Sequence, residues 1–148
     1  MFAMGESAER FGSLRPSVLA RLVEVRGAID PIYAAMPDDG FRDRIDAFLS
    51  KIEAYLSDGD WPRFARFVRR WMSLPLGEGQ SAESVLHSVV AIGDVIVQHV
   101  RQNEPANRAT VTFIGELNRL TLATVRVMVE TLADELSRRQ AKQGEGAT

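Results

Sequence analysis

Apolar side chains recur every three or four residues along most of this 148-residue chain, which is the spacing of one face of an α-helix. The clearest case lies between Asp38, a good N-cap residue, and Gly59, a good terminating residue. Its apolar stripe consists of Phe41, Ile45, Phe48, Leu49, Ile52 and Leu56. Because no segment combines strict alternation with a hairpin turn, the pattern predicts an all-α protein.

Prolines, glycines and capping residues divide the remaining chain into further helices. We predict helices at 16–27, after Asp30, at 61–72, at about 81–103 and at about 106–138, with a loop at 74–80. The length suits one domain of five to seven helices, in which two long C-terminal helices form the spine. We expect a flexible N-terminus at 1–13, the folded domain at 14–139 and a flexible tail or linker at 140–148.

The chain carries few of the groups from which catalytic and metal sites are built. It contains no cysteine, and His87 and His99 are about 3.3 turns apart on one predicted helix, so they cannot share a metal ion. It also lacks a nucleophile elbow and the glycine motifs that bind phosphates. We therefore predict that the protein is not an enzyme and uses no metal or cofactor.

The net charge indicates which partners the protein can attract, and the N-terminal sequence indicates where in the cell it is located. A net charge of -2 gives no overall attraction to nucleic acid or to an anionic membrane. The first residues lack a basic segment followed by an apolar one, and no uncharged stretch approaches the roughly 20 residues that span a bilayer. We expect a cytoplasmic protein that binds neither nucleic acid nor membrane.

The predicted helix at 61–72 is rich in arginine. Its basic side chains, which we call the arginine face, are Arg63, Arg66, Arg69 and Arg70. The helix is amphipathic and follows no helix-turn-helix signature, so we interpret this face as solvated or as the binding face for an acidic protein. A DNA-associated regulator that uses these arginines remains an alternative.

The last predicted helix, about 33 residues or about 50 Å long, exceeds what a compact domain of this size needs. One stripe, the heptad seam, has spacings of 3, 4, 3 and 4 and consists of Leu122, Val125, Val129, Leu132 and Leu136. A second stripe consists of Phe113, Ile114, Leu117, Leu120, Val127 and Met128. We predict that the heptad seam joins two copies in a homodimer through a parallel or crossed helix pair. The alternative is that both stripes belong to the core of one chain.

Three segments resemble the N-terminal sensory domain of RsbR-type stressosome proteins, which also precedes some bacterial histidine kinases. They are Pro31-Ile32-Tyr33-Ala34-Ala35-Met36-Pro37-Asp38, Ser57-Asp58-Gly59-Asp60 and Gly79-Gln80-Ser81-Ala82-Glu83-Ser84-Val85-Leu86. The similarity extends over residues 15–139. It implies a globin-like fold that binds no haem, dimerises through its terminal helices and passes a signal to a downstream signalling protein or output domain. We expect the apolar interior or the dimer cleft to respond to a partner or a small apolar ligand.

A haem-binding gas sensor is the alternative that a globin-like fold raises. By helix order, the haem-ligating histidine would come from the helix at 61–72, which contains none. The sequence therefore favours a haem-free sensory or regulatory module over a haem protein.

Overall fold

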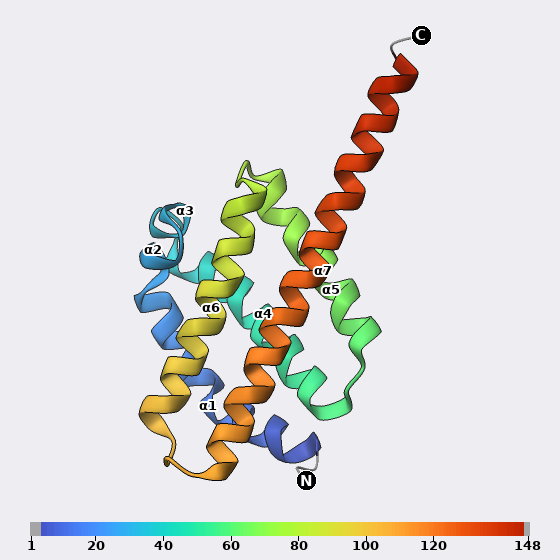
Figure 1. The fold of residues 1–148 in the computed structure, drawn as a ribbon. Coiled ribbons are helices and arrows are strands. Elements are labelled where there is room, and N and C mark those ends of the chain that lie inside the picture. The colour runs from blue at the N-terminus through green and yellow to red at the C-terminus, as the bar shows by residue number, and fades with distance from the viewer. Residues whose placement is uncertain (1–3, 147–148) are drawn as a thin grey trace.

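The computed structural model describes residues 4–146, which form seven helices and no strand (Figure 1). They are α1 (Met4–Glu24), α2 (Arg26–Ile29), α3 (Pro31–Ala34), α4 (Asp38–Asp58), α5 (Trp61–Gly77), α6 (Ala82–Asn103) and α7 (Arg108–Gly146). The predicted all-α helical bundle with two long C-terminal helices is confirmed. No helix in the described part is long and apolar enough to cross a membrane.

Side-chain caps fix where several of these helices begin. The Asp60 carboxylate accepts a hydrogen bond from the backbone N–H of Arg63 at 3.1 Å, which starts α5. The Ser81 hydroxyl oxygen accepts one from the N–H of Ser84 at 3.1 Å, which starts α6. Gly59, at φ 67°, adopts the left-handed conformation that ends α4. The end of α4 and the starts of α5 and α6 therefore lie where the capping residues predict them.

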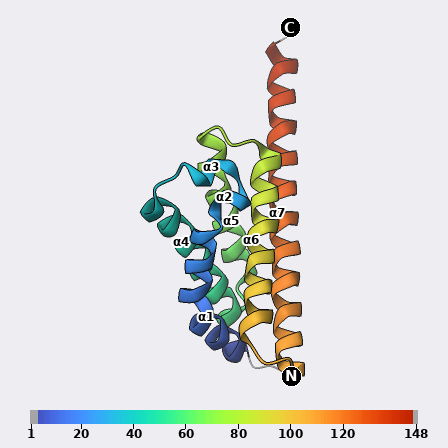
Figure 2. The same cartoon turned by 90° about the vertical axis from the view of Figure 1, so that its left-hand side faces the viewer.

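The antiparallel helices α6 and α7 form one layer, and the other helices lie against one face of it (Figure 2). Every long helix contributes large apolar side chains to a single core. Fully buried members include Phe11, Leu22, Phe41, Leu49, Val68, Phe113 and Met128. Burying one such side chain stabilises the fold by about 1.5–3 kcal/mol, so the core holds α7 along its inner face.

The prediction of a flexible N-terminus at 1–13 is wrong for residues 4–13, which belong to α1. Phe11 is fully buried and Ser7 is nearly so, on the same face as Val18 and Leu22. Proline favours the first turn of a helix, so the sequence predicts a start at Pro16, but Pro16 lies inside α1. Residues 1–3 lie outside the described residues.

The predicted loop at 74–80 is also only partly correct, because α5 continues through Gly77 with Pro75 inside it. Proline lacks the N–H that would bond one turn back, but Pro75 lies in the last turn of this helix, and its own carbonyl accepts from the Gln80 N–H at 2.9 Å. The Glu78 N–H donates to the Leu74 carbonyl at 3.0 Å. These bonds end the helix later than the sequence suggested.

The third difference concerns the predicted flexible tail at 140–148. The helix α7 extends to Gly146, is 39 residues long and measures about 58 Å at 1.5 Å per residue. Residues 140–146 are therefore helical although they include Gly144 and Gly146; Ala141 and Lys142 favour a helix, and the segment has no proline. Residues 147 and 148 lie outside the described residues. Figure 1 shows the end of α7 projecting beyond the other helices.

Candidate functional site

Three of the five residues of the heptad seam are exposed on the surface of α7. Leu122 is 70% exposed, Val129 48% and Leu136 59%, while Val125 and Leu132 are half-buried and pack against the core of their own chain. The second stripe is different, because all its members are buried except the half-buried Ile114. Single exposed apolar residues are common, but a row at heptad spacing is the surface that a second helix would cover.

The seam continues onto the part of α7 that leaves the bundle. Every residue from 133 to 144 is exposed, and an ion pair between Arg139 and Glu135 at 3.4 Å, four residues apart, lies on this surface. Such a pair contributes only about 0.3–0.5 kcal/mol, and helical segments without packing are marginal in water. A partner that covers Leu136 would therefore stabilise the projecting segment.

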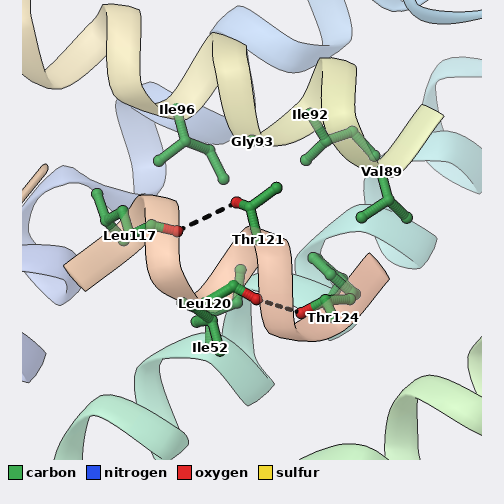
Figure 3. Close-up of a pocket in the computed structure, with 10 residues that line it drawn as sticks. Ile52, Val89, Ile92, Gly93, Ile96, Leu117, Leu120, Thr121 and Thr124 are labelled. Carbon is green, nitrogen blue, oxygen red and sulfur yellow. Dashed lines mark hydrogen bonds between the residues drawn. The ribbon is translucent and has the colours of Figure 1, made fainter. Parts of the chain in front are cut away.

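An interior cavity of about 20 Å³ lies between α4, α6 and α7 (Figure 3). Its walls are mainly apolar and include Val89, Ile92, Ile96, Leu117 and Leu120. Two threonines of α7 also line it, but Thr121 donates its hydroxyl to the Leu117 carbonyl at 3.1 Å and Thr124 to the Leu120 carbonyl at 2.7 Å. Because both hydroxyl protons are used within α7, the two threonines offer a guest only acceptor oxygens, and the rest of this cavity, which is about the size of one water, is apolar.

Gly93 sets how closely α6 approaches α7 beside this cavity. A Cβ atom at Gly93 would lie 2.6 Å from Oγ1 and 2.9 Å from Cγ2 of Thr121, which is too close for either pair of atoms. Glycine therefore permits this helix contact. Apolar spacing does not reveal this contact, although an isolated glycine inside a predicted helix often has a packing reason.

The two histidines lie away from the interior cavity. His87 is exposed on α6, and the half-buried His99 has its Nε2 atom 2.9 Å from the hydroxyl oxygen of Ser17. Neither histidine lines the cavity. Within residues 4–146, no three His, Cys, Asp or Glu side chains are grouped closely enough to hold a metal ion.

The four members of the arginine face are all exposed on α5, but they are not equivalent. Arg63 forms an ion pair with Asp58. The backbone N–H of Asp60, together with this guanidinium, holds the pKa of Asp58 below its usual range. Arg66, Arg69 and Arg70 form no ion pair with any described residue. These three arginines can therefore meet an acidic partner without breaking an existing pair.

Comparison with known proteins adds no further identification. No protein-family model, no curated protein and no solved structure matches this chain.

Proposed function

We propose that this protein is a non-enzymatic sensory or regulatory module that dimerises through the heptad seam and relays a signal along α7. The observation that carries the proposal is the exposed part of the heptad seam on a helix that extends beyond the other helices. A symmetric pair would place the same apolar row of both copies together, as a two-fold interface requires. A parallel pair would also bring the two projecting ends side by side, where a downstream signalling protein or output domain would receive the signal.

The interior cavity supports the sensory part of the proposal because α7 forms both its wall and the seam. Leu120, Thr121 and Thr124 of this helix line the cavity. Leu122 and Val125, which are their neighbours in the sequence, belong to the heptad seam. A small apolar ligand would press on the α6–α7 contact from inside. Such a ligand shifts the seam only if it binds two arrangements of these helices with different affinities.

The proposed module is globin-like and haem-free. Helix order and the two long terminal helices support the globin-like part. The positions of His87 and His99 outside the cavity, and the small volume of that cavity, favour the haem-free module over a haem-binding gas sensor. Arg66, Arg69 and Arg70, which form no ion pair within residues 4–146, favour an acidic protein as a second partner.

Sedimentation velocity at tens of micromolar tests the proposal. We expect a dimer for the unmodified protein and a largely monomeric species for Val129→Glu, because a carboxylate would be buried opposite its own copy. Circular dichroism should show unchanged helix content, since Val129 is not part of the core. Leu74→Glu, which alters an exposed leucine on α5, is the matched control and should leave the dimer intact. A monomeric unmodified protein, or loss of the whole fold in Val129→Glu, would contradict the proposal.

A further inference from the structure

A second hollow, the aromatic cleft, lies on the surface and has a volume of about 350 Å³. Its walls come from the N-terminal part of α1, the end of α4, the start of α5 and the middle of α7, through Ser7, Tyr55, Trp61, Glu116, Arg119 and Leu120. The volume falls at the lower end of the range for small-molecule sites, about 300–1,000 Å³. The cleft therefore has room for a compact ligand.

One side of the aromatic cleft carries two opposite charges on the same turn of α7. Glu116 is half-buried, and its Oε2 atom accepts a hydrogen bond from the hydroxyl of Ser7 at 2.7 Å. Ser7 is only 2% exposed, so this contact fixes one carboxylate oxygen. Arg119 is exposed and forms no ion pair with any residue of the described chain. The cleft thus offers an oriented acceptor and a free guanidinium.

Another part of the cleft lining is aromatic. The rings of Tyr55 and Trp61 meet edge to face, with centroids 5.8 Å apart and an interplanar angle of 73°. Both side chains are half-buried, so part of each ring remains available to a ligand. Leu120 forms an apolar wall and also lines the interior cavity, so one side chain belongs to both hollows. Two aromatic side chains and an apolar one in the same cleft suit a small ring.

We propose that the aromatic cleft binds a free aromatic α-amino acid. The ring would pack on Tyr55 and Trp61, the carboxylate would pair with Arg119 and the ammonium group with Glu116. A ligand with only a carboxylate would face Glu116 unfavourably, and one with only an ammonium group would face Arg119 unfavourably. A zwitterion satisfies both groups, and arginine binds a carboxylate through two parallel hydrogen bonds. This binding does not depend on the proposed dimer, although it would supply the module with a signal.

The two tryptophans provide a direct readout by NMR of the ¹⁵N-labelled full chain. Trp61 lines the aromatic cleft, whereas Trp71 is only 5% exposed and lies outside it, so its indole signal is an internal reference. We expect millimolar or lower L-phenylalanine to shift the Trp61 indole signal in a saturable manner and to leave that of Trp71 in place. Phenethylamine lacks the carboxylate and 3-phenylpropionate lacks the ammonium group. Each analogue should bind at least about tenfold more weakly, because each loses the charge-assisted hydrogen bonding of one charged group.

Two variants test which protein side chain pairs with each charged group of the ligand. Arg119→Gln should remove the preference for phenylalanine over phenethylamine. Glu116→Gln, whose amide oxygen can still accept from Ser7, should remove the preference over 3-phenylpropionate. Arg138→Gln, which alters an exposed arginine on the projecting end of α7, is the control and should change neither preference.

Two outcomes would overturn the inference. One is the absence of a Trp61 shift at millimolar L-phenylalanine, and the other is equal binding of all three ligands. Sedimentation of the same samples separates this result from the proposed function. An intact dimer without binding would refute the ligand alone, whereas binding to a monomer would refute the dimeric module alone.

Discussion

A methyl group added at Gly93 tests the α6–α7 contact on which the proposed relay depends. The new Cβ atom would meet Oγ1 of Thr121 at 2.6 Å and Cγ2 at 2.9 Å, so the two helices would have to separate. Overpacking of this kind typically costs about 1–3 kcal/mol. Alanine in place of glycine inside a helix returns up to about 1 kcal/mol through helix propensity. We therefore expect Gly93→Ala to lower the free energy of unfolding by about 1 kcal/mol.

A double-mutant cycle isolates the clash from the helix propensity. Thr121→Ala removes both close atoms and leaves only the Thr121 Cβ position, 3.3 Å from the added methyl group. In that background Gly93→Ala should become neutral or stabilising, which gives a coupling of about 1–3 kcal/mol between the two positions. Gly115→Ala is the matched control on α7, because its Cβ would meet no described atom within 4 Å apart from its chain neighbours and the nearby backbone of its own helix. This control should stabilise the protein by up to about 1 kcal/mol in either background.

Urea denaturation followed by far-ultraviolet circular dichroism measures each variant. All samples need one protein concentration, because the apparent stability of a dimer depends on it. If Gly93→Ala stabilises the protein as much as Gly115→Ala does, or if its effect is unchanged in the Thr121→Ala background, then α6 and α7 do not meet closely at Gly93. That result would remove the physical link between the interior cavity and the heptad seam.

Two further predictions concern the core. Phe11→Ala should destabilise the protein by about 3–5 kcal/mol in thermal or urea unfolding, because Phe11 is fully buried. An effect below about 1 kcal/mol, roughly that of a surface substitution, would mean that this end of α1 does not pack against the core. Xenon under pressure should enter the interior cavity and shift the methyl NMR signals of Val89, Ile92 and Ile96, while those of Val18, which lies outside it, stay in place; uniform or absent shifts would contradict an apolar cavity.

The elements that could be predicted from the sequence are those whose limits depend on neighbouring residues. The end of α4 follows from Gly59 and the apolar stripe before it, whereas the predicted cap Asp38 is the first helical residue and Pro37 precedes it as an N-cap without a side-chain hydrogen bond. The N-terminal part of α1 could not be predicted in this way, because Phe11 is held by residues far along the chain. Pro75 predicts a loop, but the effect of a proline depends on its position in the helix and on the hydrogen bonds around it, which the sequence does not show.

The candidate sites also differ in whether they are formed by residues of one helix or of several. Heptad spacing alone identified the seam, because five residues of one helix define it and three of them prove exposed. The aromatic cleft could not be found from spacing, since Ser7, Tyr55, Trp61 and Arg119 come from four different helices. Charge pattern identified the arginine face but could not show that Asp58 already pairs with Arg63.

Disulfide cross-linking tests the dimer through α7 most directly, because the chain has no cysteine of its own. Leu136→Cys introduces a single thiol in the heptad seam, and Asp134→Cys introduces one two residues away, pointing away from the seam. In a parallel pair the two thiols introduced by Leu136→Cys would face each other, so mild oxidation should yield covalent dimers of Leu136→Cys and few of Asp134→Cys. Equal cross-linking of the two variants, or none in Leu136→Cys at a concentration where the protein sediments as a dimer, would contradict the proposed interface.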